Sequence, residues 1–140
     1  MAEFTNAPLQ TVAAGGNVLF AETPVCPGFC VMHREGSGTA QLRGIGSGCK
    51  ARYKVSFGGN VAIPAGGTVA PISLAISVES EPLASATMIE TPAAAEAFSN
   101  VFAAVFVEVP HGCCTSVSVV NTGAAPVDVQ NANLIIERVG

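Results

Sequence analysis

Short runs in which apolar and polar residues alternate make up most of the chain, and they predict an all-β structure. The clearest run is Ala-Arg-Tyr-Lys-Val-Ser-Phe at 51–57, where the apolar side chains fall on one face of a strand and the polar ones on the other. The same pattern predicts nine strands, at 17–21, 29–34, 39–43, 51–57, 68–78, 83–90, 101–109, 115–121 and 127–138. Nine short strands fit two packed antiparallel sheets.

Turn-forming residues divide these runs, as in Pro64-Ala-Gly-Gly before the strand at 68–78. Residues 1–16 are small and polar and close on two glycines, so we expect a flexible N-terminal arm ahead of a single sandwich domain at 17–140. The segment 91–97 fits either a loop or one turn of helix, with Thr91 as N-cap and Pro92 at the first helical position.

The composition indicates that part of the apolar surface is covered by other subunits. Hydrophobic residues make up 49% of the chain and charged residues only 11%, against about 25% in an average soluble domain. The runs at 69–78 and 101–109 are apolar on both faces, and a membrane helix would need about 20 apolar residues in one stretch. We therefore expect no membrane contact and a subunit interface that includes Val69, Ile72, Leu74, Ile76, Phe102, Val105 and Phe106.

The charge, the N-terminal residues and the lack of catalytic motifs argue against several functions. The net charge is −4 and the six Lys and Arg residues are scattered, which argues against nucleic acid as a partner. The N-terminal residues show no basic stretch followed by an apolar one, so we expect no secretory signal. His111 lies close to Cys113 and Cys114, but no third group orients a nucleophile, and no phosphate loop or acid pair is present. We expect no enzyme activity and no cofactor.

The five cysteines leave three interpretations open. Free thiols can fill the core as small apolar side chains, which is the preferred interpretation, or some can form a disulfide after release from a reducing compartment. A zinc site would use Cys26, Cys30, Cys113 and Cys114, but a vicinal pair fits the usual ligand spacing poorly. We expect no metal site.

Several segments together resemble a family of small single-domain proteins encoded by gut Firmicutes and their prophages. They are His33-Arg-Glu-Gly-Ser-Gly, Leu42-Arg-Gly, Phe57-Gly-Gly-Asn, Pro71-Ile-Ser-Leu-Ala-Ile, Val109-Pro-His-Gly-Cys-Cys and Asn131-Ala-Asn-Leu-Ile-Ile-Glu-Arg. More distantly, the strand order resembles the trimeric jelly rolls of the tumour necrosis factor and complement globular-head type. These resemblances imply a homotrimeric jelly-roll β-sandwich of about eight to ten antiparallel strands.

The resemblance to phage-encoded proteins implies a structural virion protein of a tailed bacteriophage. In that role a trimer made in the host cytoplasm would decorate the virion surface, either as a capsid decoration or as a head-fibre protein, and its partner would be the major capsid protein. The alternative is a trimeric adhesin or receptor-binding module whose loops contact host glycans or proteins. A pocket with convergent polar groups at the loops 36–39 and 44–49 would favour this alternative.

Overall fold

The computed structural model describes residues 2–25, 30–44, 50–111 and 114–139. Within these residues the chain forms eleven strands: β1 (Ala2–Asn6), β2 (Gln10–Val12), β3 (Glu22–Val25), β4 (Val31–His33), β5 (Thr39–Arg43), β6 (Lys50–Ala62), β7 (Ile72–Val78), β8 (Glu81–Glu90), β9 (Ser99–Pro110), β10 (Cys114–Asn121) and β11 (Val127–Arg138). The all-β prediction is confirmed.

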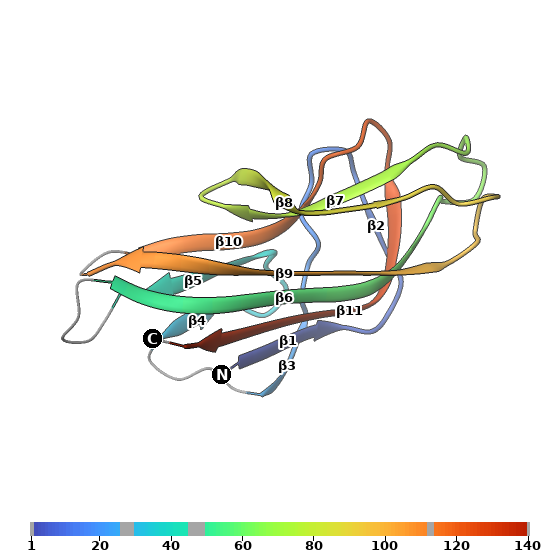
Figure 1. Cartoon of the computed structure of the whole chain (residues 1–140). Helices are drawn as coiled ribbons and strands as arrows, with labels where there is room; N and C mark the ends of the chain where they lie inside the picture. The colour runs from blue at the N-terminus through green and yellow to red at the C-terminus, as the bar shows by residue number, and fades with distance from the viewer. Residues whose placement is uncertain (1, 26–29, 45–49, 112–113, 140) are drawn as a thin grey trace.

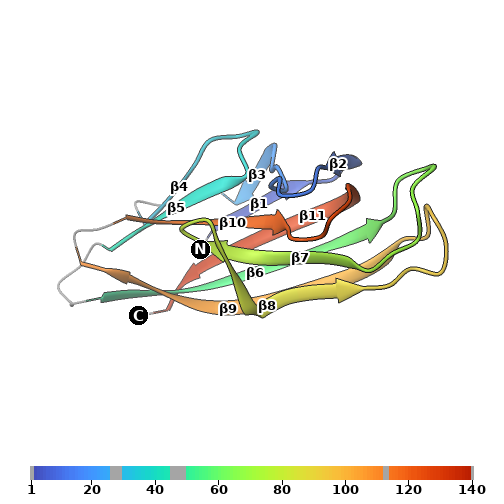
Figure 2. The same ribbon diagram turned by 90° about the horizontal axis from the view of Figure 1, so that it is seen from above.

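The strands form two antiparallel sheets that pack face to face (Figures 1 and 2). Sheet A has the order β3-β1-β11-β6-β9, and β2 pairs with the other end of β11. Sheet B has the order β4-β5-β10-β7-β8. The edge strands β8 and β9 lie side by side along one flank, so this flank joins the two sheets without hydrogen-bonded strand pairing between them.

Alternation along β6 decides which side chains enter the core between the sheets. Tyr53, Val55 and Phe57 are fully buried, while Arg52 and Lys54 point outward into solvent. The ring of Phe57 meets Phe20 edge to face, with 6.3 Å between the ring centroids. This pattern was predicted, because a strand with one buried face needs apolar residues at every second position.

Two of the predicted strands, 39–43 and 127–138, have the observed bounds. The strand predicted at 51–57 continues to Ala62, beyond two glycines that resemble a turn. The ladder continues through the two glycines, because Gly58 and Gly59 pair in register with Phe102 and Val101 of β9.

The structure differs from the expected flexible arm at residues 1–16. β1 pairs with β11 from Ala2↔Ile136 to Asn6↔Ala132, and β2 pairs with the same strand further along. Ala2 and Phe4 are completely buried, since alternate positions of β1 face the core. The apolar residues of this segment are therefore part of the sandwich.

The segment 91–97 forms bends and turns, so the loop alternative is correct and the helix is not observed. Glu96 has φ of 63°, outside the helical region, and its N–H donates to the carbonyl of Ile63 at 2.9 Å. In the described part of the chain there is no helix with the length and apolar character needed to cross a membrane.

Candidate functional site

The outer face of sheet A carries an apolar strip along its edge strand, β9. Phe102, Ala104 and Phe106 alternate with core-facing residues and together form what we call the aromatic stripe. The two phenylalanines are 65% and 67% exposed, among the most exposed large apolar side chains described. On β6 the small residues Gly58 and Ser56 lie opposite Phe102 and Ala104, while Lys54 lies opposite Phe106. An exposed aromatic strip bordered in part by small residues is typical of a contact surface.

Polar side chains border both ends of the aromatic stripe. At one end Arg52 and Glu108 form an exposed ion pair with 3.4 Å between Nε and Oε2. At the other end Asn100 donates to the Asn60 side chain at 3.3 Å, and Asn60 donates to the Asn131 side chain at 3.1 Å. An apolar centre with a polar rim is the usual composition of a protein interface.

The structure divides the predicted interface residues into two groups. Phe102 and Phe106 are exposed on sheet A, and Val69 is 47% exposed in the loop before β7. The prediction is corrected for Ile72, Leu74 and Ile76, which belong to the core between the sheets, and Val105 packs against that core from β9. The residues on the other side of β7, Ala75 and Ser77, are also buried, because the chain itself covers both faces of this strand.

Two of the four candidate zinc ligands, Cys26 and Cys113, lie outside the described residues. Cys30 and Cys114 are free cysteines, and β5 lies between them, because Arg43 pairs with Cys114 on one side and donates its N–H to the Cys30 carbonyl on the other. Within the described ranges no three His, Cys, Asp or Glu side chains are grouped as metal ligands.

Cys30 takes part in a small polar cluster that links the two sheets. The Tyr53 hydroxyl, from sheet A, lies 2.6 Å from the Arg43 carbonyl and 3.1 Å from the Cys30 carbonyl. Burial, together with the neighbouring Cys30, raises the pKa of Tyr53 to about 12. The Arg138 guanidinium donates to Cys30 Sγ at 3.4 Å and holds the pKa of that thiol below its ordinary value, an effect that partial burial opposes.

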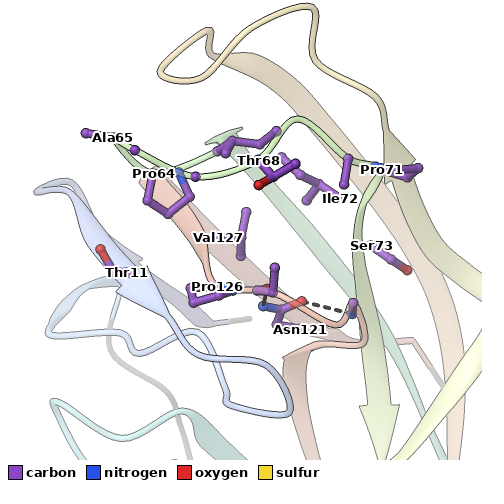
Figure 3. Close-up of a pocket in the computed structure, with 16 residues that line it drawn as sticks. Thr11, Pro64, Ala65, Thr68, Pro71, Ile72, Ser73, Asn121, Pro126 and Val127 are labelled. Carbon is purple, nitrogen blue, oxygen red and sulfur yellow. Dashed lines mark hydrogen bonds between the residues drawn. The ribbon is translucent and has the colours of Figure 1, made fainter.

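A cavity of about 330 Å³ lies at the end of the sandwich, below the loop that joins β6 to β7 (Figure 3). We call it the end pocket. Its walls come from that loop, from the loop between β10 and β11, and from β2. Apolar side chains dominate the lining, and none of the lining residues is charged: Thr11, Ile63, Pro64, Ala65, Gly66, Gly67, Thr68, Ala70, Pro71, Ile72, Ser73, Asn121, Gly123, Ala125, Pro126 and Val127.

Hydrogen bonds fix the floor of the end pocket. The buried Asn121 side chain donates to the carbonyls of Val12 at 3.1 Å and Ala125 at 2.9 Å, and it accepts the Gly123 N–H at 2.9 Å. The last of these bonds is drawn in Figure 3. These three hydrogen bonds hold Val12, Gly123 and Ala125 around one side chain, so this wall of the pocket is preformed.

A second, shallower hollow lies over the β4–β5 hairpin. It is lined by Val31, Met32, His33, Arg34, Ser37, Thr39 and Gln41. The His33 ring packs against Phe4 with 4.3 Å between ring centroids, and its Nε2 is 2.9 Å from the Ser37 carbonyl. Part of the loop that the sequence suggested for ligand contact, 36–39, therefore borders a hollow with several polar groups. The other loop, 44–49, lies almost entirely outside the described residues.

The two exposed phenylalanines of the aromatic stripe were predicted as interface residues from the sequence, whereas the end pocket was not predicted. The prolines and glycines of 64–71 and 123–126 predicted turns, and the residues that form the walls are these same turn residues. A signal was present in the prolines themselves, since Pro64, Pro71 and Pro126 supply rigid apolar surface.

Several solved structures are similar to this chain in fold. The globular domain of the zebrafish complement 1qA protein matches with a TM-score of 0.59 and 8% identity, covering 96% of this chain and 94% of that one. Murine APRIL matches with a TM-score of 0.55 and 11% identity over 95% and 97% of the two chains. The C-terminal domain of EclA, a sugar-binding protein, reaches 0.45 with 13% identity over 94% and 79%.

The chain is thus a two-sheet antiparallel sandwich that resembles the C1q and tumour necrosis factor jelly roll. At these low identities the likeness shows the fold alone. No family model and no curated protein matches the sequence.

Proposed function

We propose that this chain is a non-catalytic structural module that assembles as a homotrimer through the outer face of sheet A. The observation that carries the proposal is the aromatic stripe, in which two phenylalanines are about two-thirds exposed on a long edge strand. Leaving such a strand open in solution favours uncontrolled pairing with other chains, so a defined partner is expected there. The resemblance to trimeric jelly rolls supports a second and third copy of this chain as that partner.

The energy available at the aromatic stripe fits a stable contact. Complete burial of one phenylalanine side chain contributes about 1.5–3 kcal/mol, and each subunit offers two. Beside Phe102 and Ala104 the small residues Gly58 and Ser56 allow a partner to approach closely. The polar rim contributes specificity more than affinity, since exposed ion pairs such as Arg52–Glu108 are worth little.

The test of assembly is the solution mass measured by light scattering behind a sizing column. We expect a mass three times that of the 14.1 kDa chain. The double substitution Phe102→Ser and Phe106→Ser should yield a folded monomer, whereas Leu9→Ser, at an apolar residue of similar exposure away from the stripe, should leave the trimer intact. A monomeric wild-type protein, or a double variant that remains trimeric, would rule out the stripe as the interface.

For the biological role, we propose that the trimer decorates the capsid of a tailed bacteriophage by binding its major capsid protein. This part rests on the resemblance of six segments to a family found in gut Firmicutes and their prophages. Three linked copies would turn weak single contacts into durable attachment at positions of threefold symmetry on the shell. The site of action is then the virion surface.

The decoration proposal is tested on phage particles induced from the bacterium that encodes the chain. Antibodies against the purified protein, detected with gold in the electron microscope, should label the heads. Labelling confined to tail tips or to the host cell surface would contradict capsid decoration. Particles without the protein in their peptide spectra would contradict any virion role.

A receptor-binding module is the second candidate, and the hollow over the β4–β5 hairpin favours it. Arg34, Thr39 and Gln41 bring polar side chains to its rim. In a glycan-array experiment, binding by the wild-type trimer that is lost in Arg34→Ala, and kept in the control Arg52→Ala on sheet A, would support this function over decoration.

A further inference from the structure

The end pocket is separate from the surfaces to which the proposed function assigns roles. None of the residues of the aromatic stripe lines it, and none of the residues of the β4–β5 hollow does. Figure 3 shows the loop 64–71 on one side of the pocket and Asn121, Pro126 and Val127 on the other. Its volume of about 330 Å³ is at the lower end of the range of ligand sites in proteins, about 300–1,000 Å³.

The loop above the pocket has a fixed conformation. The Gly67 N–H donates to the Pro64 carbonyl at 2.9 Å, and Gly66 has φ of 79°, which a residue with a side chain rarely adopts. A Cβ at Gly67 would lie 2.7 Å from the Ile63 side chain, so glycine is needed at this position too. The Glu96 N–H adds a bond from the neighbouring loop to the Ile63 carbonyl. The pocket therefore does not depend on a ligand to form.

The chemistry of the lining selects a class of ligand. The absence of charged side chains from the lining means that a charged molecule would lose hydration without gaining a partner. Pro64, Pro71 and Pro126 provide rigid apolar walls, and burial of apolar surface against them is favourable. The amide of Asn121 is already engaged in three hydrogen bonds, so it is not available as an anchor.

One hydroxyl is free to orient a ligand. Thr11 donates to Asp128 at 2.7 Å and Ser73 shares a hydrogen bond with Thr122 at 2.6 Å, whereas Thr68 makes no hydrogen bond to other described residues. Thr68 belongs to the loop that forms one wall of the pocket (Figure 3). The site thus combines a mainly apolar cavity with a single side-chain hydroxyl that is not already paired, and few placed polar groups are common in small-molecule sites.

We propose that the end pocket binds an uncharged, mainly apolar small molecule that carries one hydrogen-bonding group. The cavity has room for about eleven waters at about 30 Å³ each, a volume similar to that of an aromatic molecule of about fifteen to twenty non-hydrogen atoms. The driving force is release of these waters from apolar walls. This inference is independent of trimer formation and of capsid binding.

The experiment is a titration of the full chain with N-phenylnaphthylamine, an uncharged dye whose fluorescence rises in apolar surroundings. We expect saturable binding with one site per chain, and at least about tenfold weaker binding of anilinonaphthalene sulfonate, its charged relative, because the lining offers no cation. Absence of saturable binding, or equal affinity for the two dyes, would overturn the proposal.

Matched variants locate the binding site. Ala125→Leu and Ala70→Leu each fill the pocket from an exposed wall position and should weaken binding of the neutral dye at least about tenfold. Ala84→Leu adds the same group at an exposed position of β8 outside the pocket and should leave the affinity unchanged. Melting curves identify any variant that fails to fold.

Phe102→Ser separates the pocket from the aromatic stripe. If the dye binds the end pocket, this variant keeps the wild-type affinity even where it loses the trimer. If dye binding is lost in Phe102→Ser and retained in both pocket-filling variants, the dye occupies the stripe and the inference is wrong. A protein that remains trimeric but binds no dye refutes only the pocket, whereas a monomer that binds the dye refutes only the assembly.

Discussion

Replacing Tyr53 by phenylalanine removes one hydroxyl from the point where the two sheets are joined. That hydroxyl, on β6 of sheet A, donates to the Arg43 carbonyl of sheet B at 2.6 Å and also lies 3.1 Å from the Cys30 carbonyl. The ring remains, so Tyr53→Phe leaves no large cavity in the core. The experiment therefore isolates the contribution of the hydrogen bond.

The expected loss is about 1–2 kcal/mol of the free energy of unfolding. A hydrogen bond contributes about 1 kcal/mol net, and leaving a buried acceptor without a partner adds to the cost. In the variant the Cys30 carbonyl still accepts the Arg43 N–H at 2.8 Å, so the Arg43 carbonyl is the acceptor that is chiefly affected. In urea denaturation followed by circular dichroism, this loss should lower the midpoint by about 0.5–1 M at a fixed chain concentration.

Ser56→Ala is the control, because it removes a hydroxyl from the outer face of the same strand, and its midpoint should stay close to wild type. A midpoint for Tyr53→Phe within about 0.2 M of wild type would refute the idea that this hydroxyl links the sheets.

The same hydroxyl gives a stability change at high pH. The pKa of Tyr53 is about 12 in the folded protein against an ordinary value of 10.0, chiefly because burial disfavours the phenolate. A group whose pKa is raised by folding stabilises the fold below its unfolded pKa and loses that contribution as the pH rises towards the folded value. The stability difference between wild type and Tyr53→Phe should therefore shrink between pH 10 and pH 12. Because Tyr53 is the only tyrosine, the absorbance of the phenolate reports its pKa directly.

Three further predictions concern the cysteine cluster and the end pocket. Arg138→Gln should raise the pKa of the Cys30 thiol, so the pH profile for its alkylation, followed by peptide mass spectrometry, should move to higher pH, and Arg52→Gln should not move it. Asn121→Ala removes three hydrogen bonds and should cost about 2–3 kcal/mol in urea denaturation. Gly67→Ala should cost about 1–3 kcal/mol in the same assay, since its Cβ meets the Ile63 side chain, and unchanged stability would contradict this loop conformation.

Alternation predicted the strands whose two faces have different surroundings. β5 and the face pattern of β6 follow from the sequence, because one side of each strand is buried and the other is wet. β1 shows the same alternation over fewer residues, because Ala2 and Phe4 are buried and Glu3 between them is not. Its shortness and its many small residues favoured an arm, and only the pairing with β11 shows that it belongs to the sheet.

Apolar runs without alternation were harder to interpret. Both β7 and β9 are apolar at most positions, and a partner subunit was expected on each. In the structure β7 is covered on both faces by its own chain, while β9 lies at the edge of sheet A with its phenylalanines exposed. Sequence alone does not separate these cases, since burial of a second face depends on which strands become neighbours in the sheet.

The pairing of β1 with β11 determines the order in which the molecule can be completed during synthesis. β1 is among the first residues described to leave the ribosome, yet its central partner, from Ala132 to Ile136, is among the last. Until then β1 has only β3 to pair with, and the middle of sheet A cannot close. The sandwich can therefore close only after β11 has been made, and its folding is slow, as for other β proteins dominated by contacts distant in sequence. A nascent chain stalled before β11 would expose its unfinished sheet to chaperones and proteases.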